Sequence, residues 1–153
     1  KTTFELGTTA LLGSSDADTR NEVAAIGLDT TWIHHVTPTN RFKWQNELYA
    51  QWRDETTEGL SNNPMGFYSL LDYRLSPRWG IGGRFDYVEP VDAPASNPRD
   101  ADLAGSLYLT LYQSEFARWR AQYKHVDSAD GGNDDQFLLQ ATVAIGVHKH
   151  QLQ

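Results

Sequence analysis

The chain has 153 residues, of which 39% are hydrophobic and 12% aromatic, and its formal net charge is −7. This length fits one domain, residues 1–153, and in an all-β chain a sheet of about eight strands. The acidic charge argues against nucleic acid, and without cysteine there is no disulfide, thiolate metal site or cysteine nucleophile. The mean hydropathy is −0.57 and the longest apolar runs are as short as Ala24–Leu28, so no transmembrane helix of about 20 apolar residues can be built. A membrane β-barrel tolerates a low mean hydropathy because only alternate residues meet lipid.

Eight strand-like segments follow one another along the chain, and the breaks between them alternate between long and short. The long breaks are rich in Asp and Glu. An up-and-down sheet would then carry all its long loops at one end, as outer-membrane barrels do with their outer loops. The predicted breaks are Ser14–Asn21, Thr37–Arg41, Asp54–Pro64, Pro77–Trp79, Glu89–Asp100, Gln113–Phe116 and Asp127–Asp135.

The segments between these breaks alternate with a period of two, which predicts strands. The contrast is weak in residues 3–13 and 23–36 and clear from residue 42 onward. In residues 42–53, Phe42, Trp44 and Leu48 share one face while Lys43 and Gln51 share the other. We expect the polar face to line a barrel lumen. Its predicted charged residues are Glu47, Arg53, Asp72, Arg74, Arg84, Asp86, Arg118, Arg120 and Lys124.

The break at Pro77–Trp79 also predicts a register. A three-residue turn there would place Asp72 opposite Arg84 as an ion pair in the lumen. The same register would place Tyr73 opposite Gly83, so that an aromatic ring covers a glycine on the outer face.

Aromatic residues on the apolar face form two rows, one near the short turns and one towards the long loops, with aliphatic residues between them. Such rows are typical of the interfacial girdles of a membrane barrel, whose apolar face points outward. The predicted girdle residues are Trp32, Trp44, Trp52, Tyr73, Trp79, Tyr87, Trp119 and Tyr123.

Five sequence blocks carry a family resemblance over nearly the whole chain. They are Phe42–Glu47, Gly66–Tyr73, Arg78–Tyr87, Ser114–Tyr123 and Gln136–Gly146. Together they resemble the C-terminal half of porin-like outer-membrane proteins related to the phosphate-selective porins. That group includes proteins described as zinc-regulated outer-membrane receptors. The resemblance implies a larger barrel in a longer chain, and passive solute passage.

Two features depart from the pattern of that family. The chain ends in His148–Gln153 rather than on the aromatic residue that the barrel-assembly machinery reads, and the N-terminal barrel half is not in this sequence. The segment Lys1–Phe4 already reads as a strand, so we expect a mature form or an excised part of a longer chain. Either the chain has been cut, or its eight strands close alone.

The inward basic residues allow two interpretations. In a wide barrel, Arg118, Arg120 and Lys124, together with Arg74 and Arg84, would line a path for anions. In an eight-stranded barrel the interior is only wide enough for side chains to fill it, and the same residues would form a packed ion-pair network.

Histidine pairs near the short turns are the only metal-binding candidates. These are His34, His35, His148 and His150. No third ligand is fixed near them by the sequence, so we expect interfacial histidines, no metal site and no cofactor.

His125 beside Asp127 and Ser128 is the one candidate catalytic group. Strand parity puts His125 on the lipid face, which is wrong for a triad, so we expect no enzyme.

We therefore expect an all-β, antiparallel, up-and-down transmembrane β-barrel with eight strands in this chain. We expect it in the outer membrane of a Gram-negative bacterium, with periplasmic termini and extracellular acidic loops that meet lipid and lipopolysaccharide. The predicted function is porin-like solute passage, with a homo-oligomer or an N-terminal half completing the wall. The alternatives are a sealed eight-stranded barrel with a structural or surface-recognition role, and a soluble lipocalin-like barrel for an apolar ligand.

Overall fold

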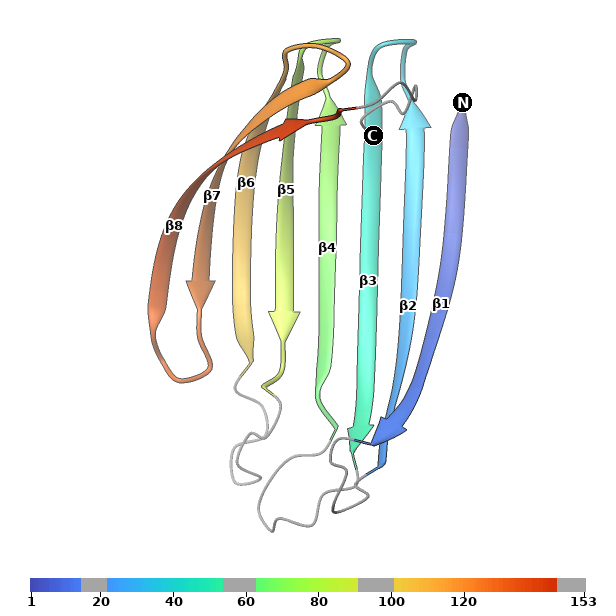
Figure 1. Cartoon of the computed structure of the whole chain (residues 1–153), viewed down its shortest axis with the longest axis vertical. Coiled ribbons are helices and arrows are strands. Elements are labelled where there is room, and N and C mark those ends of the chain that lie inside the picture. Colours follow the sequence, from blue (N-terminus) through green and yellow to red (C-terminus); the bar gives the residue numbers. More distant parts are fainter. Residues whose placement is uncertain (15–21, 54–62, 91–100, 146–153) are drawn as a thin grey trace.

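A computed structural model describes residues 1–14, 22–53, 63–90 and 101–145. In this part of the chain every regular element is a strand, and all eight belong to one sheet in chain order (Figure 1). The strands are β1 (Thr2–Ser14), β2 (Glu22–His35), β3 (Arg41–Arg53), β4 (Met65–Arg74), β5 (Trp79–Val88), β6 (Asp102–Tyr112), β7 (Ala117–Asp127) and β8 (Asn133–Val143).

Each strand pairs antiparallel with its neighbour in sequence, so the predicted all-β, up-and-down arrangement is confirmed. The sheet is open: among the described residues, the first and last strands, β1 and β8, pair on one side only. The predicted closure into a barrel is therefore not seen. In Figure 1, β7 and β8 bend strongly at one side, so the sheet curves.

The connections sort onto opposite ends of the sheet. The N-terminus and the connections 36–40, 75–78 and 113–116 lie at one end, here called the turn end (Figure 1). The other end is called the loop end. The last connection, 128–132, is shorter than the predicted break Asp127–Asp135, because β7 runs to Asp127 and β8 begins at Asn133.

The three turns share one hydrogen-bond pattern. A hydroxyl at the second residue of each connection accepts the backbone N–H three residues later. The distances are 3.0 Å from Asn40 to Thr37, 3.1 Å from Trp79 to Ser76 and 3.1 Å from Ala117 to Ser114. This local hydroxyl acceptor fixes where each hairpin turns, and hence the register of the strands that follow.

The predicted register of β4 and β5 is wrong. Backbone N–H groups of Leu75 and Ser76 both donate to the Trp79 carbonyl, so the turn is Ser76–Arg78 and not Pro77–Trp79. This moves the pairing by two residues: Asp72 lies opposite Gly82 and not Arg84. Tyr73 lies opposite Ile81, and Leu71 takes the place beside Gly83.

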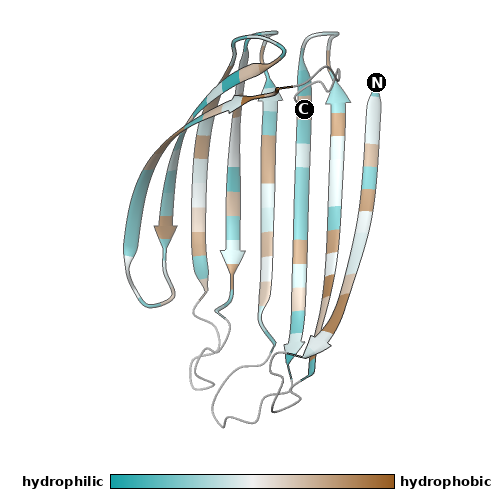
Figure 2. Cartoon of the chain, viewed as in Figure 1, coloured by the Kyte–Doolittle hydropathy of each residue, from teal (hydrophilic) through white to brown (hydrophobic). Residues whose placement is uncertain are grey.

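Hydropathy bands alternate along the strands in Figure 2 as the sequence pattern predicts. On β6, Tyr108 and Thr110 are 5% and 0% exposed, whereas Leu107 and Leu109 are 68% and 44% exposed. We call the face with Tyr108 the inner face and the face with Leu109 the outer face.

Candidate functional site

Tyrosines of β6 organise the inner face around two glycines of β5. The Tyr108 ring lies where a Cβ on Gly82 would project, and the Tyr112 ring lies 3.4 Å from the position of a Cβ on Gly80. Because these glycines carry no side chain, the tyrosines cross β5 and reach β4. The Tyr108 hydroxyl donates to Asp72 Oδ2 at 3.1 Å, and Asp72 is only 8% exposed.

Arginines stack on these inner tyrosines in three places. The guanidinium carbon of Arg120 lies 4.0 Å from the Tyr108 ring centroid. In the same way, Arg74 lies 4.3 Å from Tyr112 and Arg84 lies 3.9 Å from Tyr68. Such cation–π contacts hold a guanidinium in place without neutralising its charge.

Arg84 also pairs with Asp86, two residues along β5, and the Nη2–Oδ1 distance is 2.5 Å. This replaces the predicted partner Asp72. A depression of about 240 Å³ lies over this pair. Its lining residues include Arg84, Asp86, Ser106, Arg120 and Lys124.

The other predicted lumen residues have neutral partners or mark strand ends. Glu47 Oε1 accepts the Tyr49 hydroxyl at 2.5 Å, and Arg118 Nε donates to Thr142 Oγ1 at 3.3 Å. Arg53 is the last residue of β3, at the loop end. The inward tyrosines were not singled out by sequence reasoning, although a tyrosine facing a strand glycine was a visible signal.

The predicted girdle aromatics all lie on the outer face, and several carry a hydrogen bond at their polar tip. Trp44 Nε1 donates to Ser69 at 3.0 Å and Trp119 Nε1 donates to Gln113 at 2.8 Å. Towards the loop end, the Tyr87 hydroxyl donates to Glu89 at 2.7 Å. The rings therefore lie over the apolar face with their polar atoms bound to protein acceptors.

The remaining girdle residues extend the same rows. Trp32 packs edge-on against Phe42 with a centroid separation of 5.4 Å, and Tyr73 lies opposite Phe42 in the register. Trp79 lies opposite Leu111, and Trp52 is half-exposed next to the end of β3.

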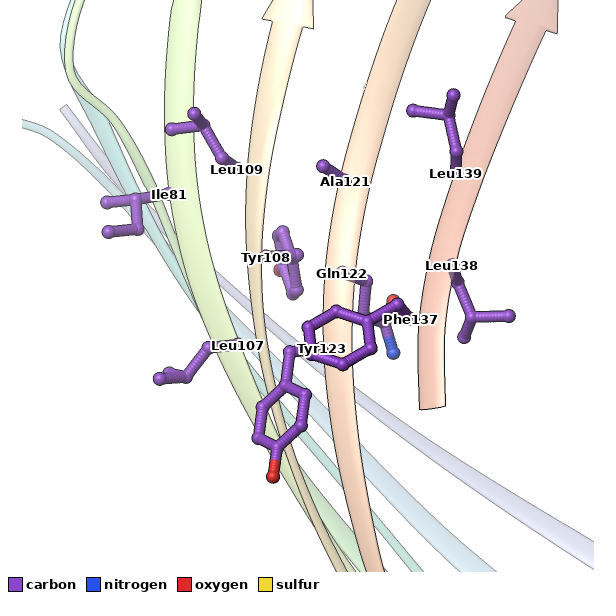
Figure 3. A pocket seen from close by; sticks show the side chains of 10 residues that line it. All are labelled: Ile81, Leu107, Tyr108, Leu109, Ala121, Gln122, Tyr123, Phe137, Leu138 and Leu139. Atoms are coloured by element: carbon purple, nitrogen blue, oxygen red, sulfur yellow. The ribbon is translucent and has the colours of Figure 1, made fainter. Parts of the chain in front are cut away.

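An apolar depression of about 520 Å³ lies on the outer face across β5–β8. Figure 3 shows Leu107, Leu109 and Leu139 pointing away from the strands, with the rings of Tyr123 and Phe137 beside them. Those two ring centroids are 5.1 Å apart. The depression presents carbon almost throughout, which suits hydrocarbon chains and no polar ligand.

His34 and His35 lie on opposite faces of β2. His34 Nδ1 is 2.9 Å from Thr2 Oγ1 and its ring stacks on Trp32. His148 and His150 lie outside the described residues. Among residues 1–14, 22–53, 63–90 and 101–145, no three His, Cys, Asp or Glu side chains gather as a metal site.

His125 lies on the outer face, as strand parity predicts, and its partner is Asp135 rather than Asp127. The His125 Nδ1 lies 2.7 Å from Asp135 Oδ1, and the Tyr123 hydroxyl donates to the same oxygen at 2.7 Å. All three side chains lie on the outer face and leave Asp127 and Ser128 out of the cluster.

The fold and the site define the chain as an all-β protein, built as one antiparallel meander with a charged inner face and an apolar outer face. Within the described residues, no helix has the length and apolar character to cross a membrane. Comparison with family models, with curated proteins and with solved structures found no match.

Proposed function

We propose that the chain forms the wall, or part of the wall, of a transmembrane β-barrel in the outer membrane of a Gram-negative bacterium. Solutes pass along its inner face. One observation carries the proposal: the large apolar side chains are the exposed ones. Phe85 is 45% exposed and Leu107 68%, while Asp72 is buried. Apolar surface exposed to water destabilises a folded protein, whereas the same surface in contact with lipid stabilises it.

The placement of aromatics and loops supports the same proposal. The girdle residues border an aliphatic belt on the outer face, with Ile81, Leu107 and Leu109 between the rows. In this proposal the turn end faces the periplasm, and the acidic loop end faces lipopolysaccharide outside the cell.

The open edges bear on the size of the barrel. Hydrocarbon offers no hydrogen bonds to an unpaired strand edge, and each unsatisfied backbone group there costs several kcal/mol. The proposal therefore requires that β1 and β8 find partners, either each other or further strands. Further strands would come from a second copy or from an N-terminal barrel half, and the barrel-assembly machinery would join them.

A sealed eight-stranded barrel is the second candidate. The three arginine–tyrosine stacks and the Arg84–Asp86 pair favour it, because side chains fill the interior of so narrow a barrel. The separation of β1 from β8 favours the wider, conducting form. A lipocalin-like carrier is disfavoured, because an apolar ligand would meet arginines and carboxylates on the inner face.

The proposal assigns no catalytic role. His125, Asp135 and Tyr123 lie on the outer face, where the proposed lipid would exclude a water-soluble substrate.

Planar-bilayer recording tests the proposal with protein purified from the membranes of producing cells. We expect stepwise currents as single pores insert. Silence from protein that remains tightly membrane-associated would favour the sealed barrel. Solubility without detergent would contradict both membrane forms.

A further inference from the structure

The inner face carries its charges unevenly along the strands. At the turn end, Arg41 begins β3 and Arg74 ends β4, directly opposite each other. Arg118 and Arg120 lie near the start of β7, at the same end. We call these four residues the arginine row.

Most inner-face carboxylates lie farther towards the loop end, whereas Asp72 and Glu5 lie in the turn-end halves of β4 and β1. Asp29 and Glu47 are opposite each other in the middle of β2 and β3. Asp86, Asp102 and Asp134 lie in the loop-end halves of β5, β6 and β8. Six residues of β3 separate Glu47 from Arg41, which is about 20 Å at the rise of an extended strand.

Neutral groups hold the arginine row. Arg120 Nε donates to Thr110 Oγ1 at 3.2 Å, and Arg74 Nη2 donates to the Pro77 carbonyl at 2.9 Å. Within the described segments, none of the four arginines forms an ion pair. Their positive charge is therefore not neutralised by a direct ion pair, although Asp72 lies two residues from Arg74 on the same face.

The carboxylates are also largely uncancelled. Glu47 accepts from the Tyr49 hydroxyl, and Asp72 accepts from the Tyr108 hydroxyl, which leaves both anions without a bonded cation. The Arg84–Asp86 pair is the local exception, and it adds no net charge.

Lys43 adds a fifth cation at the turn end, where Asp72 and Glu5 are the inner-face carboxylates. Towards the loop end, Arg53 and Lys124 are outnumbered by four carboxylates that form no ion pair within the described residues, namely Asp29, Glu47, Asp102 and Asp134. The inner face is thus net positive at the turn end and net negative from mid-strand towards the loop end.

We propose that this axial charge separation makes the pore rectify, so that its current depends on the sign of the voltage. This inference rests on the proposed solute passage. A fixed charge concentrates mobile ions of the opposite sign close to it. A voltage that drives cations in from the loop end and anions in from the turn end fills the pore with both ions. The opposite voltage depletes the pore of both.

Current–voltage curves of single pores test this inference. At about 0.1 M salt the screening length is roughly 10 Å, so the fixed charges act across the lumen, whereas at about 1 M it is roughly 3 Å. We expect a larger current when the loop-end compartment is positive, and near-equal currents at the higher salt. The chain has no cysteine, so Ala129→Cys and an impermeant maleimide identify the loop-end compartment.

Two variant pairs address the two ends separately. Arg41→Gln with Arg74→Gln should bring the ratio of currents at opposite voltages close to one at low salt, and so should Asp29→Asn with Glu47→Gln. If one pair fails to assemble, the other still tests the inference. Arg78→Gln removes one positive charge from the exposed turn and should leave the ratio unchanged.

The outcomes separate the two proposals. Open pores with symmetric currents at low salt would overturn the charge-separation inference and leave solute passage standing. Asymmetry that survives both variant pairs would also overturn it. Membrane-associated protein without any current would remove the proposed passage and this inference together.

Discussion

The Tyr108 hydroxyl on β6 reaches the Asp72 carboxylate on β4 across the strand between them, at 3.1 Å. Gly82 on β5 makes this contact possible, since the tyrosine ring occupies the space of the missing side chain. Three strands are thus tied together by one side chain. The same ring supports the Arg120 guanidinium, so the contact also sets the position of an inner-face charge.

Replacing Gly82 with Ala should destabilise the protein by about 1–3 kcal/mol, because the new methyl group meets both the Tyr108 ring and the Leu71 carbonyl oxygen. Gly105→Ala is the matched control, since nothing lies within 4 Å of a Cβ at that strand glycine. Urea unfolding in detergent measures both variants. Equal midpoints would contradict the proposed packing.

Removing the Tyr108 hydroxyl with Tyr108→Phe should lower the free energy of unfolding by about 1–3 kcal/mol, because the buried Asp72 carboxylate loses its donor. Tyr112→Phe also removes an inner-face hydroxyl but keeps the ring beneath Arg74. We expect it to change the stability little. If both variants lose the same free energy of unfolding, the hydrogen bond to Asp72 is not the cause of the loss.

Leu109→Arg should block insertion into a bilayer, since a charge on the proposed lipid face near the midplane costs roughly 2–4 kcal/mol. Gln122→Arg adds the same side chain on the polar inner face of β7 and should insert normally. Sedimentation with liposomes and protease protection report insertion. Normal insertion of the Leu109 variant would reverse the proposed assignment of the two faces.

Ser76→Ala should destabilise the β4–β5 hairpin by about 0.5–1.5 kcal/mol, because the Trp79 N–H loses its side-chain acceptor. Ser76→Thr keeps the hydroxyl and should behave like the wild type. Thermal unfolding in detergent compares the three proteins. A wild-type melting temperature for the alanine variant would show that the backbone bonds alone define this turn.

The alternation of side chains predicted the faces well, because a period of two is a local property of each strand. Residues such as Leu107 and Tyr108 fall on the expected sides for this reason. The β4–β5 register could not be read from Pro77 alone. The signal was the recurrence of a hydroxyl at Thr37, Ser76 and Ser114, each three residues before the N–H that it accepts.

Long-range relationships were harder to predict. The ion pair expected between Asp72 and Arg84 depended on the predicted register, which would have placed the two residues directly opposite each other on β4 and β5. The structure instead pairs Arg84 with Asp86 on its own strand and brings Tyr108 to Asp72 from two strands away. The periodicity of β4 or β6 alone does not predict the Tyr108–Asp72 contact, because it depends on Gly82 in the strand between them.

Strands β1 and β8 contain no proline or lysine, and their pairing with β2 and β7 runs without a bulge. In water, the unpaired N–H and C=O groups of such edge strands pair with other chains, which leads to aggregation or amyloid-like stacking. In the proposed membrane barrel these edges become satisfied only when a partner strand pairs with them, so a chain that stays in water before assembly would be exposed to aggregation.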